Sequence, residues 1–324
     1  MRDAYSKFQA AGIRLYAISY DDQEALSEFS NTQEIPYPLL SDLNSDVIRK
    51  FGILNDQIGG DPLLSGIPFP GSFVADESGV VVAKFFHDSY KKRDSPESLI
   101  DAALGRFELP GNAPQATTIN QEVRLTAAVQ GGKGSLRQGI IRQLIVRFEL
   151  AEGLHIYGEP VPEGMIPARI TVEPRPGLVV LDTIRPPSRA LRLEEMGIEL
   201  QVWSGTVDFI LPFYPTGEMA SETRPLDMES TSLEINVRFQ ACNDQTCLLP
   251  RTEKLEIELP LDVIDVPAIS VHMGHGQREA DYDGMPHMRR LLLRKIKRKP
   301  LGVFGFVGKA IQRELAALRR RLSP

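Results

Sequence analysis

The two cysteines of this chain, Cys242 and Cys247, are the residues with the clearest capacity for chemistry. The alternating pattern of residues 233–239 predicts a strand that leads to Cys242. Asn243 and Asp244 then favour a turn, so Cys247 returns on the other arm. In such a hairpin the two sulfurs can reach disulfide distance. A disulfide of this kind can exchange with an outside thiol, whereas two thiols alone do not fill the four positions of a zinc site.

The same pair has a structural alternative, in which the disulfide only closes its loop. Closing a loop of about six residues stabilises a fold by about 2 kcal/mol, and a domain of about 150 residues buries a sufficient core without it. A short, exposed hairpin disulfide is of the labile and exchangeable type. We therefore favour exchange over loop closure. The spacing leaves open which of the two cysteines is attacked.

The elements that must position this pair are strands. Apolar and polar residues alternate with a period of two, and Gly and Pro separate the alternating segments, which is typical of an antiparallel β-sandwich. The sandwich is expected over residues 118–267. Its expected strands are 123–129, 140–150, 168–173, 198–203, 207–213, 233–239 and 255–259.

Residues 1–108 have a different pattern, in which helix-like and strand-like segments alternate, and this predicts an α/β unit. A buried strand is expected at 13–19, followed by a helix that Asp21 or Asp22 caps. Further helices are expected near 45–51 and 96–107, and a hairpin leads into residues 80–86. Proline and glycine in residues 109–117 indicate a linker to the sandwich.

The C-terminal part is a linker, residues 268–287, and a basic helical tail, residues 288–324. The tail contains 12 Lys and Arg and one acid, whereas the rest of the chain contains 25 bases and 42 acids. We expect first a solvated, partly ordered tail, and the alternative is a helix that lies on an anionic membrane surface. Nucleic acid is an unlikely partner because stacking aromatics are limited to Phe304 and Phe306.

No cofactor and no metal site are expected. His272, His275 and His287 lie in a segment of linker composition, without acidic or thiol ligands at a fixed spacing. The chain has no stretch of about 18 apolar residues, which excludes a membrane-spanning helix. Its first residues have no apolar signal region, so the sequence as written predicts a cytoplasmic protein.

The α/β unit resembles the redoxin group of the thioredoxin superfamily, the AhpC/TSA or peroxiredoxin-like branch. The matching segments are 17–21, 37–42, 51–53 and 70–76. The resemblance implies a thioredoxin-like fold with a cis-proline, for which Pro70 is the first candidate and Pro68 the second. It also implies a reactive thiolate at the start of the first long helix, yet residues 1–108 contain no cysteine.

The first strand and the start of the cysteine-bearing helix of that fold are also missing. We therefore expect a truncated start, in which case an extracytoplasmic location is open. A peroxidase function, the second alternative, would need a cysteine upstream of Met1.

The sandwich resembles the immunoglobulin-like N-terminal domain of the thiol:disulfide interchange protein DsbD. The resemblance rests on Phe-Gln-Ala-Cys at 239–242 with a second cysteine before Pro250, and on segments 151–157 and 202–205. It implies that Cys242 and Cys247 exchange electrons with a thioredoxin-like partner and that an aromatic cap shields them. By position Trp203 is that aromatic, and a place in the sandwich core is its equally open alternative.

We therefore expect a thiol–disulfide redox protein, acting as an oxidoreductase through Cys242 and Cys247. The first alternative is a redox-silent binding or membrane-surface module. The redox partner and the direction of electron flow stay open.

Overall fold

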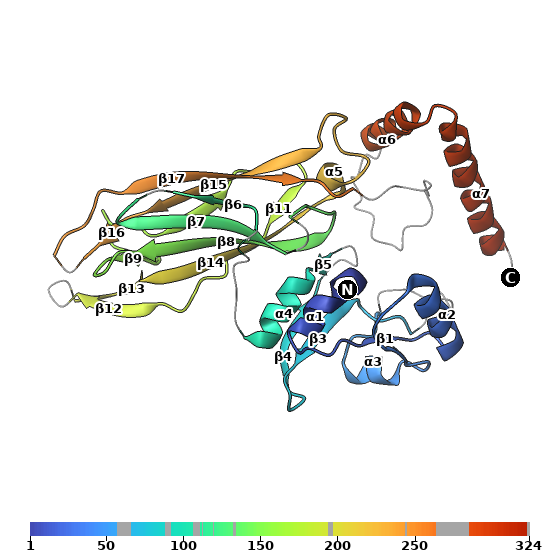
Figure 1. Cartoon of the computed structure of the whole chain (residues 1–324), viewed down its shortest axis with the longest axis horizontal. Coiled ribbons are helices and arrows are strands. Elements are labelled where there is room, and N and C mark those ends of the chain that lie inside the picture. Colours follow the sequence, from blue (N-terminus) through green and yellow to red (C-terminus); the bar gives the residue numbers. More distant parts are fainter. Residues whose placement is uncertain are drawn as a thin grey trace. The chain divides into compact units, whose positions relative to one another are not determined.

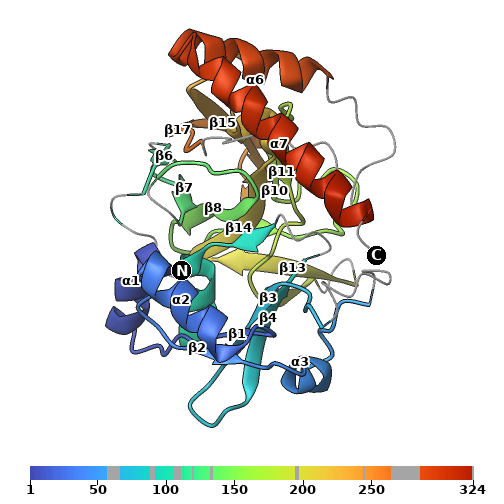
Figure 2. The same cartoon turned by 90° about the vertical axis from the view of Figure 1, so that its right-hand side faces the viewer.

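The computed structural model describes residues 1–56, 66–87, 92–105, 111, 113–118, 120–131, 134–193, 197–243, 245–263 and 285–322. The chain divides into two compact units, one made of Met1–Glu108 with Val266–Pro324 and the other of Leu109–Asp265. Figures 1 and 2 label the helices and strands of both units. Residues 1–105 and the β-rich unit each have a hydrophobic core of their own.

Short helices and two separate strand pairs make up residues 1–105. β1 (Ala17–Ser19) runs parallel to β2 (Leu39–Ser41), and β3 (Gly71–Ala75) forms an antiparallel hairpin with β4 (Val81–Phe86). Buried Phe8, Val74 and Leu99 form the core. The remaining elements are η1 (Arg2–Ala4), α1 (Tyr5–Ala10), α2 (Gln23–Gln33), α3 (Asp46–Lys50), β5 (Arg93–Asp94) and α4 (Pro96–Leu104).

Local side chains explain where two of these helices begin. The Asp22 carboxylate accepts a hydrogen bond from the Ala25 amide at 2.8 Å, which confirms the expected cap of α2. Ser95 Oγ accepts from the third residue of α4 at 3.3 Å. Gly105 ends α4 with φ +59°, in the left-handed region that glycine enters without strain.

The strand expected at 13–19 is shorter and less buried than predicted. Only Ala17–Ser19 pairs, because its ladder partner β2 is itself three residues long. Ile18 in the middle of β1 is exposed, so the expectation of a buried strand was wrong. An apolar run shows that a strand can form, but the neighbouring elements determine whether it is covered.

Neither Pro68 nor Pro70 follows a cis peptide bond, which corrects the expectation drawn from the resemblance. Among the described residues the cis bond is Glu159–Pro160. Backbone hydrogen bonds of 2.7 and 3.0 Å join the residues on either side of Pro68 to residues 53–55. These bonds hold the chain around Pro68 in an extended, trans form.

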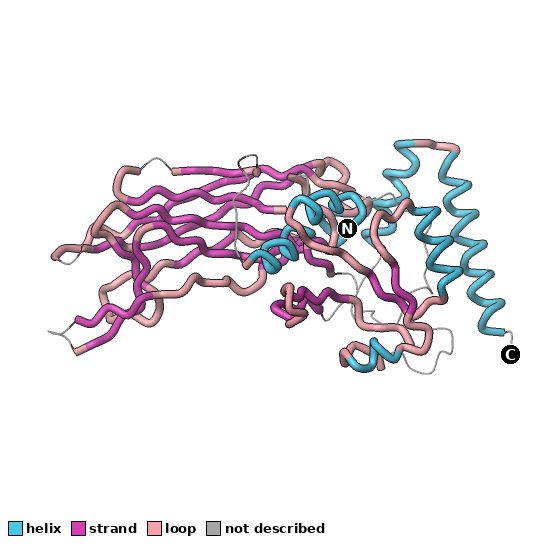
Figure 3. Tube along the Cα trace, turned by 60° about the horizontal axis from the view of Figure 1, so that its bottom comes forward, coloured by secondary structure: helices cyan, strands magenta, loops and turns pink. Residues whose placement is uncertain are grey.

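Residues 113–263 form an antiparallel β-sandwich, as the period-two pattern predicts (Figure 3). One sheet has the strand order β11-β14-β8-β7-β6 and the second has the order β10-β15-β17. A third sheet, made of four short strands, has the order β12-β13-β9-β16. The bounds are β6 (Gln115–Thr117), β7 (Val123–Gln130), β8 (Ile140–Leu150), β9 (His155–Tyr157), β10 (Arg169–Val172), β11 (Leu178–Val180), β12 (Arg189–Leu193), β13 (Ile198–Ser204), β14 (Thr206–Pro215), β15 (Ser230–Phe239), β16 (Ala241–Cys242) and β17 (Arg251–Pro260).

Three phenylalanines mark the centre of the sandwich core. The ring of Phe148 contacts Phe209 edge-on at 5.4 Å and Phe239 at 5.6 Å between centroids. In β15 every second residue is buried, from Leu233 to Phe239, because successive side chains of a strand point to opposite faces. Phe239 therefore fixes the end of β15 in the core, three residues before Cys242.

The C-terminal part contains α6 (Met285–Arg298) and α7 (Gly302–Leu322), and a short helix, α5 (Gly217–Ala220), lies in the β-rich unit. Of the described helices, none is both long and apolar enough to cross a bilayer. Gly305 and Gly308 lie within α7, so these glycines do not break the helix. Most of the expected linker, with His272 and His275, lies outside the described residues.

Candidate functional site at the Cys242–Cys247 disulfide

Cys242 and Cys247 form a disulfide across a tight hairpin, with their Cα atoms 4.0 Å apart. The side chain of Asn243 organises the turn, since its Oδ1 accepts hydrogen bonds from the amides of Gln245 at 2.9 Å and Thr246 at 2.7 Å. The Asn243 amide in turn donates to the Thr246 carbonyl at 2.9 Å. The hairpin expected from the sequence is thus the one that the structure contains.

The two cysteines differ in their access to solvent. Cys242 is fully buried, with 0% of its surface exposed, and it belongs to the strand β16. Cys247 is exposed on the returning arm, and Leu249 beyond it is 84% exposed. An outside thiolate therefore meets Cys247 first. This asymmetry could not be read from the spacing of the two residues.

Cys242 lies against a small cluster that is separate from the main core. It is buried together with Tyr157, Leu200 and Val202. In the ladder between β16 and β9, Cys242 is directly opposite His155, and opposite residues point to the same face of a sheet. The predicted strands did not include β9, whose sequence of three residues is too short for a periodic pattern.

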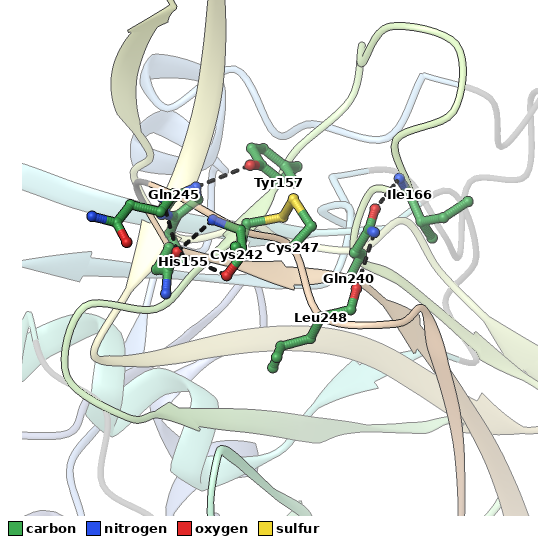
Figure 4. The surroundings of a disulfide bond; sticks show 10 residues. His155, Tyr157, Ile166, Gln240, Cys242, Gln245, Cys247 and Leu248 are labelled. Atoms are coloured by element: carbon green, nitrogen blue, oxygen red, sulfur yellow. Dashed lines mark hydrogen bonds between the residues drawn. A yellow bond between two sulfur atoms is a disulfide. The ribbon is translucent and has the colours of Figure 1, made fainter.

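His155 and Tyr157 form a buried polar pair beside the disulfide (Figure 4). His155 Nε2 lies 3.0 Å from the Tyr157 hydroxyl, and the two rings are nearly perpendicular at 5.1 Å. Burial raises the pKa of the Tyr157 hydroxyl, so this group keeps its proton at neutral pH. The pair brings an imidazole and a protonated hydroxyl to the face of the sheet that carries Cys242.

Gln240 fixes the hairpin to the loop that follows β9. Its Nε2 donates to the Leu248 carbonyl at 3.1 Å, and its Oε1 accepts from the Ile166 amide at 3.2 Å (Figure 4). The Leu248 amide also donates to the Ala241 carbonyl at 2.8 Å. Both arms of the hairpin are therefore held on either side of the disulfide.

Arg251, a base close to the pair in the sequence, forms an ion pair with Glu122 at 2.7 Å. In the loop after β9, hydrogen bonding to Arg169 lowers the pKa of Glu159. Among the described residues, no group of three or more His, Cys, Asp or Glu side chains is arranged to hold a metal ion.

Trp203 and Cys242 lie on opposite faces of the sheet β12-β13-β9-β16. It neighbours Val202 in β13, and Val202 is the residue that shares the cluster of Cys242. The Trp203 ring packs edge-on against Phe209 at 4.9 Å, and its Nε1 donates to the Pro186 carbonyl at 3.0 Å. This geometry favours the core role of Trp203 over the cap role. Residues 194–196, between β12 and β13 in the sequence, lie outside the described residues.

Comparison with known proteins matches two separate regions of the chain. Residues 1–84 match the model of the AhpC/TSA family, and residues 114–259 match the N-terminal model of the thiol:disulfide interchange protein DsbD. The first region is similar to chloroplastic peroxiredoxin Q. It is 33% identical to the Arabidopsis thaliana protein over 103 residues, which cover 32% of this chain and 43% of that protein. It is 32% identical to the Sedum lineare protein, of which it covers 50%.

The chain thus spans about half or less of these curated relatives. Among solved structures it is similar to the N-terminal periplasmic domain of ScsB from Proteus mirabilis, with a TM-score of 0.32 and 18% identity over 46% of this chain and 52% of that one. It is also similar to the reduced N-terminal domain of Neisseria meningitidis DsbD, with a TM-score of 0.25 and 13% identity over 47% of this chain and 90% of that one.

Both matched models describe thiol-redox families, and the chain has a disulfide of its own between Cys242 and Cys247. These two matches also confirm the predicted fold classes, a thioredoxin-like α/β region followed by an immunoglobulin-like β-sandwich. The chain joins a thioredoxin-like region of the AhpC/TSA family, at residues 1–84, to an immunoglobulin-like DsbD N-terminal domain at residues 114–259.

Proposed function

We propose that this protein exchanges electrons between its Cys242–Cys247 disulfide and a dithiol protein of the thioredoxin type. The observation that carries the proposal is the unequal access of the two sulfurs, one buried and one exposed, on a hairpin held at both arms. The match to the DsbD N-terminal model supports the kind of partner. The direction of flow depends on the reduction potentials of the two pairs.

The first step is attack of a partner thiolate on Sγ of exposed Cys247. A bond forms between the partner's sulfur and Cys247 Sγ, the Cys242–Cys247 bond breaks, and Cys242 leaves with the electron pair as a thiolate. The second thiolate of the partner then attacks the partner's own sulfur in the mixed disulfide and releases Cys247. The partner ends as a disulfide, and this chain, after taking up two protons, ends as a dithiol.

The Cys242 thiolate would form in a buried site, where desolvation disfavours the charge. We propose that His155 and Tyr157 are positioning residues for this step, holding a proton on the same face of the sheet as the leaving sulfur. The register of Cys242 with His155 and the hydrogen bond between His155 and Tyr157 support this role. A Tyr157→Phe variant should slow reduction of the disulfide and shift its pH profile.

A pair of single-cysteine variants tests the assignment of the attacked sulfur. Cys242→Ser leaves the exposed thiol and Cys247→Ser leaves the buried one. Each variant is mixed with a thioredoxin that keeps one cysteine, activated as its thionitrobenzoate disulfide, and release of thionitrobenzoate is followed by absorbance. We expect Cys242→Ser to form the mixed disulfide at least tenfold faster, because its thiol needs no opening of the fold.

The two variants are matched controls for stability, since each loses the same loop closure. Equal rates, or a faster reaction of Cys247→Ser, would refute the assignment. If the oxidised wild-type protein is not reduced by reduced thioredoxin, as judged by mass-spectrometric thiol trapping, the exchange function itself is excluded. Loop closure would then be the role of the disulfide.

The AhpC/TSA region supports no peroxide reduction by a cysteine of its own. Peroxide reduction in that family depends on a cysteine thiolate, and residues 1–108 of this chain contain no cysteine. A peroxidase function would therefore have to use a thiol from outside these residues. We propose electron exchange at Cys242 and Cys247 in preference to it.

The compartment determines the resting form of the pair. An oxidising, extracytoplasmic compartment would keep the disulfide, and a reducing cytoplasm would keep the dithiol. We propose the extracytoplasmic location, which the presence of this disulfide favours. Alkylation of intact cells that express Cys242→Ser with a membrane-impermeant maleimide tests it. The exposed Cys247 thiol of this variant is free, so protein outside the cytoplasm should be labelled and protein in the cytoplasm should stay unlabelled.

A further inference from the structure

The basic C-terminal helices carry an apolar face that other described residues leave uncovered. α6 and α7 are joined by a turn at Lys299–Leu301, where the Gly302 amide donates to the Lys299 carbonyl at 2.9 Å. The Lys295 ammonium lies 5.1 Å from the centroid of the Phe306 ring, so the two helices contact each other (Figure 2). Leu291 is also buried. One side of this helix pair is therefore already packed.

A second set of apolar side chains on α7 remains in solvent. Phe304 is 73% exposed, and Val307, Ile311 and Leu315 are exposed as well. Their spacings of three and four residues place them on one face of the helix. Phe306, which is buried, lies on a different face. These four exposed side chains form a continuous apolar stripe along α7. Burial of the stripe in an apolar environment would stabilise it, because apolar surface is removed from water.

The same arrangement continues on α6 and in the turn. Leu293 and Ile296 are exposed, and Leu301 in the turn is 83% exposed. Arg289 and Lys297 are exposed four residues before and after Leu293, so they lie on its face of the helix. Positive side chains thus flank the apolar ones.

We infer that α6 and α7 bind the surface of an anionic lipid bilayer. Aliphatic side chains gain from burial at the acyl boundary while the flanking bases meet the lipid phosphates. Nucleic acid would use the bases but would give the aliphatic stripe no contact. Since no described helix is apolar and long enough to span a bilayer, the helices would lie along its surface. This inference is independent of the proposed redox function.

Co-sedimentation of the full chain with large unilamellar vesicles tests the inference. At 0.1 M salt the protein should bind vesicles that contain 30% phosphatidylglycerol in phosphatidylcholine, and bind pure phosphatidylcholine at least tenfold more weakly. Equal binding to both compositions, or no binding to either, would overturn the inference.

The apolar face is tested by a combined Phe304→Gln, Ile311→Gln and Leu315→Gln variant, which keeps good helix formers at exposed positions. Binding to the anionic vesicles should fall at least tenfold. A control with Val82→Gln and Leu226→Gln, two exposed apolar residues outside these helices, should bind as the wild type does. An unchanged affinity of the stripe variant would count against the inference.

The charges are tested separately with Lys297→Gln and Lys309→Gln. Because each base contributes about 1 kcal/mol at an anionic surface, their loss should weaken binding about 30-fold. A control with Arg189→Gln and Lys254→Gln in the sandwich should not. Tighter binding to duplex DNA than to the vesicles, or a lipid-free oligomer that the stripe variant abolishes, would assign the surface to another partner and overturn the inference.

Discussion

Reduction of the disulfide is the perturbation that best separates electron exchange from simple loop closure. An exchanging pair must leave the sandwich folded in both redox states. The loop between the two cysteines is short, with a sequence separation of 5, so its closure should stabilise the fold by only about 2 kcal/mol. The buried residues of the main core, among them Phe148 and Phe239, lie outside this loop.

The assay is urea unfolding of the wild-type protein with and without a phosphine reductant. Trp203 is the one tryptophan of the chain and lies buried against Phe209, so its fluorescence reports on the sandwich alone. We expect a cooperative transition in both states, with the midpoint lowered by about 1 M urea in the reduced state.

Loss of the cooperative transition on reduction, or destabilisation by more than about 5 kcal/mol, would refute this reasoning. Either result would show that the sandwich depends on the disulfide for its fold. A change near 2 kcal/mol with an unchanged slope would agree with a pair that can be opened and closed without unfolding.

Three further predictions concern the surroundings of the pair. In the reduced protein, N-ethylmaleimide should modify exposed Cys247 at least a hundredfold faster than buried Cys242. The two rates are measured by peptide mass spectrometry after timed quenching, and similar rates would contradict the difference in burial. Gln240→Ala should destabilise the sandwich by about 1–3 kcal/mol in the tryptophan assay, because it removes the hydrogen bonds to Leu248 and Ile166, whereas Gln245→Ala, at an exposed turn position, should have little effect. The arginine partner of Glu159 lowers the folded-state pKa of its carboxyl, so the stability from this pair is present above the usual Glu pKa and is lost as the pH falls through the folded pKa. Glu159→Gln should therefore flatten the plot of unfolding free energy against pH in that acidic range. A plot identical to that of the wild type would rule the contribution out.

Local features of the chain could be predicted because their cause is local. The cap of α2 depends on one side chain, Asp22, and an amide three residues away. The cysteine hairpin depends on a turn-forming Asn243 between two arms. The sandwich strands depend on alternation within a few residues, as β15 illustrates. Each of these is encoded over a short stretch, so no distant contact is needed to interpret it.

Other features depend on segments that are far apart in the sequence. The expectation of a cis bond at Pro68 or Pro70 came from a family resemblance, but residues 53–55 hold that segment extended. Ile18 has the pattern of a buried strand, yet its side chain is exposed because nothing in the short β1–β2 pair covers it. Composition and periodicity do not encode which elements lie alongside a strand.

The sequence by itself determined that this protein has two cysteines on a tight turn, a strand-rich domain to carry them and a basic, helical tail. Only the tertiary structure decided that Cys242 is buried while Cys247 is exposed, and that His155 lies opposite Cys242. It also decided that Trp203 faces the main core. The physical reason is that burial and the face of a side chain follow from pairing between strands more than 80 residues apart, such as β9 and β16, which no local pattern specifies.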